Sequence, residues 1–219
     1  MSKRDQIIQD LEKEKLICIF RAKYKDINVI IDAASACIAA GAHFIEITYD
    51  HTGYANNSFQ IVKALKDKYK DKAYIGFGTV LNLDEAKKCL KYTDDYIVAP
   101  TFSKEISDYC KENDIYYMPG VLTATEAVNA YQEGNPIVKL FPTGEIGLDY
   151  AKALMKPLGF IKYFGVGKMT TEFYEECLKF GFVGCGVSSS INSLEILDAK
   201  DYTYIQNKVS EYIAISKQF

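Results

Sequence analysis

The sequence predicts a closed barrel of eight parallel strands, each followed by a helix. Eight short apolar runs recur along the 219 residues, with starts 20 to 30 residues apart, and helix-patterned segments fill the intervals. Strands that alternate with helices in this way pair in parallel. A length of about 200 residues is the compact limit for a (β/α)8, or TIM, barrel. The same elements are also compatible with an open, doubly wound sheet, which is the alternative fold.

The expected strands are short runs of apolar residues. They cover residues 16–22, 44–49, 74–80, 96–101, 116–121, 137–143, 162–167 and 182–188. No linker rich in proline, glycine or serine and no low-complexity tract divides them. We therefore expect residues 1–219 to form a single barrel domain.

Helix signals occupy the intervals between these runs. The expected helices cover residues 27–42, 57–70, 82–92, 103–113, 123–134, 147–159 and 171–181, and residues 1–15 predict an extra N-terminal helix. Asn82 and Thr123 are each followed three residues later by Glu, which is typical of a helix start. Several segments end at glycine, as helices commonly do; these are Gly41, Gly134, Gly159 and Gly181.

Composition excludes several classes of protein. The formal net charge of -3, with lysines spread among acids, argues against nucleic-acid or membrane binding. The charged N-terminus lacks the apolar core of a secretory signal, and no window reaches the length of a membrane span, so a cytoplasmic protein is expected. The six cysteines form no CxxC pair and are expected to be reduced and buried. Two histidines are too few for a His-rich zinc site, so we expect no metal.

Two charged residues stand inside apolar strand runs. Lys139 lies in IVKLFPT and Glu46 lies in FIEITY. Strand alternation points Lys139 away from the face of Val138 and Leu140. If that face is the barrel interior, loss of solvent lowers the lysine pKa and frees its amine to form a Schiff base with a carbonyl. Glu46 would then move protons.

An alternative interpretation of the same two residues is a buried Lys139–Glu46 ion pair without chemistry, although such pairs are a poor source of stability. Lys162, at a strand entrance, is expected to be an ordinary solvated lysine.

Glycine-rich turns follow the last two expected strands. Gly165-Val166-Gly167-Lys168 ends the first, and the second continues from Gly184 through Gly186 to Ser188, Ser189 and Ser190. Barrels often bind phosphate at these two loops, where backbone N–H groups approach the anion. GVGKMT does not have the spacing of a P-loop. We therefore expect an anion site built from the two turns, and expect the third glycine turn, GFGT at 76–79, to shape the floor of the site.

Together these residues resemble the KDPG/KHG aldolase family, the class I aldolases of 2-keto-3-deoxy-6-phosphogluconate and 4-hydroxy-2-oxoglutarate. The resemblance extends from about residue 15 to residue 192. It comprises IFRA (19–22), GAHFIEIT (41–48), GFGTVLN (76–82), YIVAP (96–100), MPGVLTATE (118–126), VKLFPTG (138–144) and GVSSS (186–190). Their order and spacing are more specific than any single motif.

The resemblance implies a homotrimer of barrels that cleaves a keto sugar acid, phosphorylated or not, to pyruvate and an aldehyde without a metal or other cofactor. It implies that Lys139 is the Schiff-base lysine and Glu46 the proton shuttle. The implied substrate-binding residues are Thr79, Pro100 and Phe141 in the pyruvate pocket, Arg21 at the end of the first strand and Ser188 at the phosphate end; Gly167, Lys168 and Gly186 join them from the glycine turns.

The sequence departs from the family pattern at two places. The family usually has arginine four residues after the glutamate, where it helps to hold the substrate carboxylate, and this chain has Asp50. A carboxylate there is expected to repel a keto acid. The family's threonine-glycine-glycine is Val166-Gly167-Lys168 here, which loses one backbone approach and gains a cation.

Two other functions fit the same barrel. A phosphosugar isomerase or epimerase would use Glu46 as the base and the glycine turns for phosphate. A non-catalytic binding descendant would have lost carboxylate recognition at Asp50. Activity that survives Lys139→Ala would favour the isomerase, and an absence of turnover across keto-acid aldols would favour the binding protein.

Overall fold

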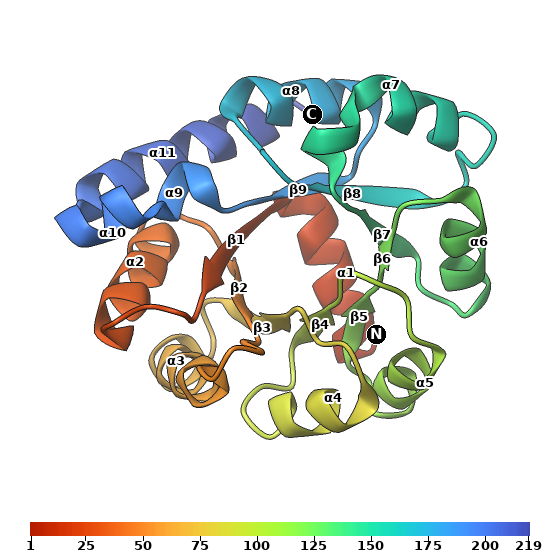
Figure 1. Ribbon diagram of the computed structural model, residues 1–219. Helices are drawn as coiled ribbons and strands as arrows, with labels where there is room; N and C mark the ends of the chain where they lie inside the picture. The colour runs from red at the N-terminus through yellow and green to blue at the C-terminus, as the bar shows by residue number, and fades with distance from the viewer.

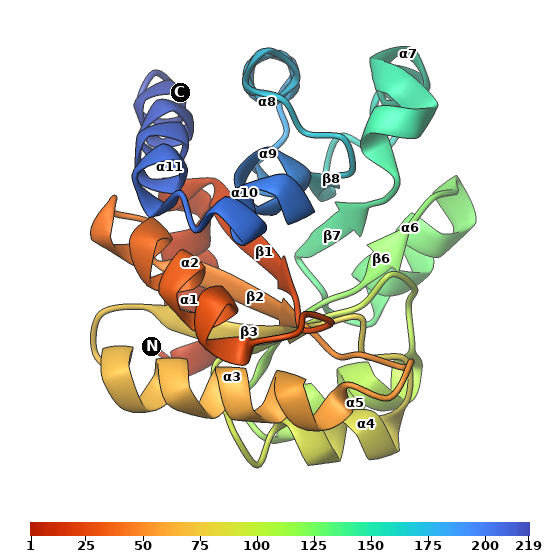
Figure 2. The same ribbon diagram turned by 60° about the vertical axis from the view of Figure 1, so that its left-hand side comes forward.

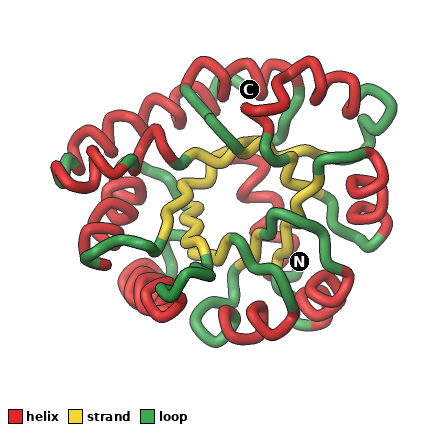
Figure 3. The backbone as a smooth tube through the Cα atoms, in the orientation of Figure 1, coloured by secondary structure: helices red, strands yellow, loops and turns green.

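Parallel strands and helices alternate through most of the chain in the computed structural model, which describes residues 1–219. The strands are β1 (Leu16–Arg21), β2 (Phe44–Thr48), β3 (Tyr74–Gly78), β4 (Tyr96–Val98), β5 (Tyr116–Met118), β6 (Gly120–Val121), β7 (Ile137–Leu140), β8 (Lys162–Val166) and β9 (Gly184–Val187). They form a ring with the helices outside it (Figures 1 and 3). The barrel prediction is confirmed, and the open doubly wound sheet is not formed.

Pro119 explains why the eight predicted runs appear as nine strands. The strand order is β5-β4-β3-β2-β1-β9-β8-β7-β6, and every pairing is parallel. The predicted run 116–121 is divided at Pro119, which has no N–H to donate. Its first half pairs with β4 and its second half with β7, so this one run closes the barrel. The Pro119 carbonyl still accepts the Lys139 N–H, at 2.8 Å.

The outer helices occupy the predicted intervals. They are α2 (Ile27–Ala39), α3 (Ala55–Tyr69), α4 (Leu83–Cys89), α5 (Lys104–Glu112), α6 (Ala124–Gln132), α7 (Thr143–Met155) and α8 (Thr171–Phe180). Thr123 forms the predicted capping box with Glu126, and Asn82 caps α4 through the Glu85 N–H. Gly181 ends α8 in the left-handed conformation. Gly159 does not end a helix, because α7 stops at Met155.

Three helices follow the last strand, where the sequence signals above predict none. They are α9 (Ser189–Asn192), α10 (Leu194–Ala199) and α11 (Tyr202–Ser216). Helix α11 packs beside α2 and α8 and covers the outer face of the barrel (Figure 2). No helix in the structure is long and apolar enough to cross a membrane.

The N-terminal helix α1 (Lys3–Glu14) closes one end of the barrel. It is visible through the ring of strands in Figure 1, and its apolar residues Ile7 and Leu11 are fully buried. They pack against an inner cluster that projects from the strands into the lumen: Ile17, Ile19, Phe44, Tyr96, Val98, Tyr116, Met118, Ile137 and Phe164. The predicted extra helix therefore blocks the end of the barrel at which the strands begin.

Polar contacts fix α1 in this position. The Glu12 carboxylate accepts from Lys162 on β8 at 2.6 Å, and Tyr74 on β3 donates to Asp10 at 2.8 Å. Lys162 is exposed, as predicted, but its role is to hold this helix.

Candidate active site

Lys139 and Glu46 face each other across the barrel. Lys139 projects from β7 and Glu46 from β2, and the strand order places four strand-to-strand steps between them in either direction around the ring. Both side chains point into the lumen, because their strand neighbours Val138, Leu140, Ile45 and Ile47 belong to the outer core under the helices. Alternation along each strand thus brings the two predicted residues together.

Lys139 is buried in surroundings that contain no partner for its charge. Its side chain is 5% exposed, and its register neighbours are Gly120 on β6 and Phe164 on β8. Its Nζ lies 5.1 Å from the centre of the Phe141 ring, which lines the mouth of the site. Burial lowers the pKa of Lys139 below its ordinary value, and the negative charge of Glu46 only partly offsets this. The amine is therefore easier to deprotonate than a surface lysine.

Glu46 is also buried, with 2% exposure. Its side chain lies over Gly78 on β3, where a Cβ atom would collide with the carboxyl group, so glycine is required for Glu46 to occupy this position. Burial raises the pKa of Glu46, and the positive charge of Lys139 opposes the rise without cancelling it. A carboxyl group with a raised pKa exchanges protons readily near neutral pH.

The simple ion-pair interpretation does not describe this geometry. The Lys139 and Glu46 charges influence each other, but their N and O atoms are farther apart than the 4.0 Å of an ion pair. A pair that served stability alone would be in contact and hydrogen bonded, because burial of separated charges costs several kcal/mol.

Three other predicted residues lie at the ends of neighbouring strands. Arg21 is the last residue of β1, is exposed, and pairs in register with Thr48 on β2, one layer above Glu46. Thr79 directly follows β3 with a φ of 60°, a strained value for a β-branched residue. Pro100 follows β4, and its backbone passes so close to Gly120 that no side chain fits there. All three therefore lie on the rim of the barrel at which the strands end.

The two glycine turns lie at the ends of β8 and β9. Gly167 and Lys168 have φ values of 119° and 46°, and Lys168 is 70% exposed with Nζ 3.7 Å from Glu145. Gly186 is buried on β9 next to Ile19, and Ser188 immediately precedes the short helix α9 without capping it. Both turns thus lie on the same rim of the barrel as the ends of β2 and β7.

Asp50 accepts hydrogen bonds from its own loop, which was not predicted from the sequence. Its Oδ1 accepts from the backbone N–H groups of Thr52 at 2.7 Å and Tyr54 at 2.9 Å, and so it shapes the loop before α3. Burial raises the pKa of Asp50, but these hydrogen bonds and nearby Lys23 outweigh it and leave the pKa below its usual value. The carboxylate is thus charged and committed to its own loop.

Two positioning contacts were not predicted from the sequence. The Thr143 hydroxyl donates to the Leu140 carbonyl at 2.6 Å and accepts from the Val166 N–H at 3.2 Å, which ties the end of β7 to β8. The His51 Nε2 donates to the Thr79 carbonyl at 2.9 Å. Thr143 is the last residue of the IVKLFPT run and His51 follows Asp50. No spacing rule in the sequence indicates that these two side chains bind residues of other strands.

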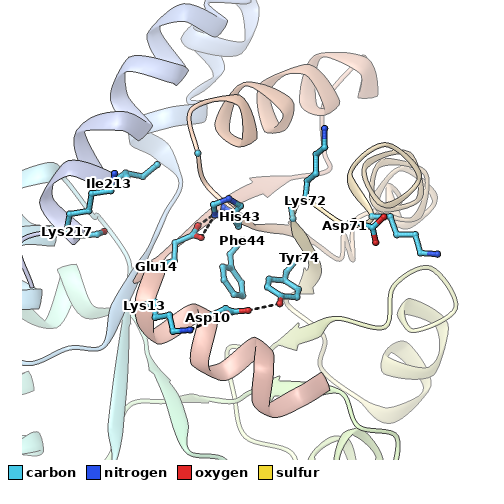
Figure 4. Close-up of a pocket in the computed structure, with 14 residues that line it drawn as sticks. Asp10, Lys13, Glu14, His43, Phe44, Asp71, Lys72, Tyr74, Ile213 and Lys217 are labelled. Atoms are coloured by element: carbon cyan, nitrogen blue, oxygen red, sulfur yellow. Dashed lines mark hydrogen bonds and ion pairs between the residues drawn. The ribbon is translucent and has the colours of Figure 1, made fainter. Parts of the chain in front are cut away.

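A large cavity lies at the other end of the molecule. A hollow of about 650 Å³ lies where the strands begin, and Figure 4 shows Glu14 bound to His43 and Asp10 bound to Tyr74 beside it. Neither Lys139 nor Glu46 lines it. In (β/α)8 barrels catalysis takes place where the strands end, so the Lys139–Glu46 end remains the candidate active site despite the size of this cavity.

Comparisons with known proteins identify the family of the chain. The chain is 32% identical over 157 residues to the 2-dehydro-3-deoxy-6-phosphogalactonate aldolase of Escherichia coli K12, covering 71% of this chain and 75% of that enzyme. A solved structure described as native KDPGal superposes with a TM-score of 0.80 at 27% identity, covering 93% of this chain and 94% of that one.

A KDPG aldolase of Legionella pneumophila, solved with pyruvate captured as a covalent carbinolamine, has a TM-score of 0.80 at 20% identity, covering 91% of this chain and 94% of that one. At that identity the likeness concerns the fold. The sequence profile of the family described as KDPG and KHG aldolase matches residues 7–208. Because this match spans nearly the whole barrel, the chain belongs to the KDPG and KHG aldolase family.

Proposed function

We propose that Lys139 is the Schiff-base residue of this class I aldolase and that Glu46 is its proton shuttle. The observation that supports these roles is the pair of buried, opposite charges that face each other without contact. Family membership makes the chain a carbon–carbon lyase, and these are the two groups that such a reaction needs.

The reaction follows from the positions of the two groups. The neutral Lys139 amine attacks the C2 carbonyl of the keto acid, and protonated Glu46 supplies the proton with which the carbinolamine hydroxyl leaves as water, so that a protonated imine and a Glu46 carboxylate remain. Glu46 then accepts the proton of the C4 hydroxyl as the C3–C4 bond breaks; the electron pair of that bond forms the C2=C3 double bond of an enamine, and the π pair of the imine moves to its nitrogen. The aldehyde departs, Glu46 returns its proton to C3 of the enamine, and hydrolysis releases pyruvate and the free lysine, with the remaining proton returned to Glu46.

The substrate class is a 2-keto-3-deoxy sugar acid. Arg21, Thr79, Pro100 and Phe141 surround the mouth of the site, where the pyruvate half of the substrate would lie. The turns that carry Gly167, Lys168, Gly186 and Ser188 would hold a phosphate at the other end of the substrate, through backbone N–H groups and the Lys168 charge. The Escherichia coli relative is named for a phosphorylated substrate, which supports this assignment.

Trapping with borohydride tests the Schiff base. Pyruvate plus borohydride is expected to add mass at Lys139 in the unmodified protein, and Lys139→Ala is expected to abolish both the adduct and retro-aldol activity. Lys162→Ala is the matched control, because Lys162 is an exposed strand lysine bound to Glu12. No adduct on any lysine would contradict the mechanism, and activity that persists in Lys139→Ala would favour an isomerase or epimerase.

A retro-aldol screen with pyruvate detection tests the substrate. Phosphorylated and unphosphorylated keto-deoxy acids are compared in the unmodified protein and in Lys168→Ala. We expect the phosphorylated substrates to have the higher kcat/KM and Lys168→Ala to reduce only that advantage. Equal values for both substrate classes would remove the phosphate assignment while leaving the roles of Lys139 and Glu46 intact. No turnover of any keto-acid aldol would favour a binding protein.

Assembly and location belong to the same proposal. We propose that the chain acts as one domain, since β9 pairs with β1 and α11 packs on α2, and that it assembles as a homotrimer in the cytoplasm. All six cysteines are free and buried, which is typical of a reducing compartment. Light scattering gives the mass that distinguishes a trimer from a monomer.

A further inference from the structure

Two tyrosine hydroxyls lie inside the barrel without a hydrogen-bond partner. Tyr96 on β4 and Tyr116 on β5 are neighbours in register, and both are fully buried. Neither hydroxyl contacts a donor or an acceptor. Such an unsatisfied group costs about 1–3 kcal/mol, and phenylalanine would avoid this cost at both positions. The third unpartnered hydroxyl, on Tyr163, belongs to the outer core beneath the helices.

The Tyr96 ring leans across β3 toward β2. A Cβ atom on Gly76 would collide with the outer atoms of this ring, so the ring occupies the space above Gly76. Gly76 is the register neighbour of Glu46, and the Glu46 carboxyl group lies over Gly78, two residues farther along the same face. The phenol from β4 and the carboxyl from β2 therefore converge above two glycines that lie about 7 Å apart along the strand.

Tyr116 does not share this placement. The Tyr96 ring reaches over Gly76, on the strand next to Glu46, and no such approach to β3 is found for Tyr116. After burial, Glu46 raises the pKa of the Tyr96 phenol most, ahead of Asp95, Cys18 and Glu14, whereas Glu12 and Arg4 of α1 act on Tyr116.

We infer that Tyr96 is a positioning residue for Glu46, and that its hydroxyl donates a hydrogen bond, relayed by one internal water molecule, to the Glu46 carboxylate. An ordered water commonly bridges two buried polar groups that lack a partner in the protein. The relay holds the carboxylate toward Lys139 and favours its charged form. This inference rests on the role proposed above for Glu46.

The groups that face Glu46 make the relay testable. Lys139 faces it from β7, Tyr96 from β4 and the apolar Ile19 from β1, with Arg21 one layer above; β3 presents only glycines. Deuterium uptake into the methyl group of pyruvate, at saturating pyruvate in D2O, requires the carboxylate while Lys139 is bound covalently. Its dependence on pH therefore reports Glu46 alone.

We expect Tyr96→Phe to move the acidic limb of this profile upward by about 0.5 to 1 pH unit, because a donor to the carboxylate is lost. The maximal exchange rate should fall about 3- to 10-fold, with the KM for pyruvate unchanged. Tyr116→Phe and Tyr163→Phe each remove an equally unpartnered buried hydroxyl and should reproduce the unmodified profile. An unmoved limb in Tyr96→Phe, or equal shifts in Tyr96→Phe and Tyr116→Phe, would overturn the inference.

A crystal structure of the unmodified protein provides a second test that does not depend on a variant. Ordered water between the Tyr96 hydroxyl and the Glu46 carboxyl group supports the relay, and a dry apolar contact there overturns it. Glu46→Gln separates this inference from the proposed function. If Glu46→Gln keeps full exchange activity, the role of Glu46 itself is wrong; if it is inactive while Tyr96→Phe is normal, only the relay is wrong.

Discussion

The two halves of the barrel lumen differ in how their polar groups are paired. In the lower half, where the strands begin, α1 closes the opening with Ile7 and Leu11, and its carboxylates are bound by Lys162 and Tyr74. In the upper half, where the strands end, Lys139 and Glu46 are buried without an ion pair between them. One end of the barrel is thus closed by the packed apolar side chains of α1, which we call the plug. The other end holds two buried charges that form no ion pair.

This difference indicates that apolar burial in the lower half offsets the free-energy cost of the buried charges in the upper half. An uncompensated buried charge costs several kcal/mol, and folding tolerates this only if burial elsewhere offsets it. Each fully buried side chain such as Ile7 or Leu11 contributes about 1.5–3 kcal/mol. The lower half therefore stabilises a structure in which the upper half keeps its charges free for a substrate.

Removal of the carboxylate tests the upper half with the largest expected effect. Glu46→Gln keeps the shape of the side chain but cannot accept a proton, so kcat should fall by about 10²- to 10⁴-fold. The melting temperature should change little, because the burial cost of the carboxylate is removed together with its attraction for Lys139. Steady-state retro-aldol kinetics and thermal unfolding measure both. A large loss of stability would show that Glu46 holds the fold together.

Truncation of the plug tests the lower half. Leu11→Ala removes a fully buried side chain of α1 and should lower the free energy of unfolding by about 2–5 kcal/mol. The kcat per folded molecule should not change, because the plug does not reach Lys139. Urea unfolding and active-site titration by borohydride trapping check the two statements. A fall in kcat among correctly folded molecules would mean that the two halves are coupled.

Addition of one methyl group beside Glu46 tests the position of this carboxyl group in the upper half. Gly78→Ala places a Cβ where the Glu46 carboxyl group now lies, and the end of that flexible side chain is the part that must move. We expect kcat to fall by about 10²-fold with little loss of stability, since a displaced catalytic group is costly even when the fold is intact. Gly159→Ala, where the nearest atom is 3.7 Å from the added Cβ, is the control. Normal activity in Gly78→Ala would contradict the observed position of Glu46.

The smallest expected effect concerns stability and pH. Burial lowers the pKa of folded Lys139, whereas an unfolded lysine titrates at about 10.4. Between these two values the unfolded chain binds more protons, so the free energy of unfolding rises with pH in that window; below the folded pKa the full penalty for the buried charge remains. Lys139→Met should lack this rise and be about 1–4 kcal/mol more stable at neutral pH.

Denaturant unfolding of both proteins at about pH 7 and about pH 10 measures this difference. Parallel pH dependences for the unmodified protein and Lys139→Met would show that Lys139 has the same pKa in the folded and unfolded states.

Local patterns were sufficient for most of the architecture. The eight apolar runs and the capping signals at Asn82 and Thr123 depend on neighbours within a few residues, so they can be interpreted without a structure. The same is true of Lys139 and Glu46, since a charge inside an apolar strand is visible in the sequence itself. The division of the fifth run at Pro119 and the kink of α7 at Gly147 depend on pairing and packing that no local pattern specifies.

The sequence by itself determined the alternation of strands and helices and the identity of the two buried charges, because these follow from periodicity and burial along single strands. Only the tertiary structure decided that the barrel is closed, that the two charges stand apart, that Asp50 is bound by its own loop, and that Tyr96 reaches over Gly76 toward Glu46. Apart from the local contacts of Asp50, these features involve residues from different strands. Their distances depend on how the closed barrel positions its walls, which no stretch of sequence contains.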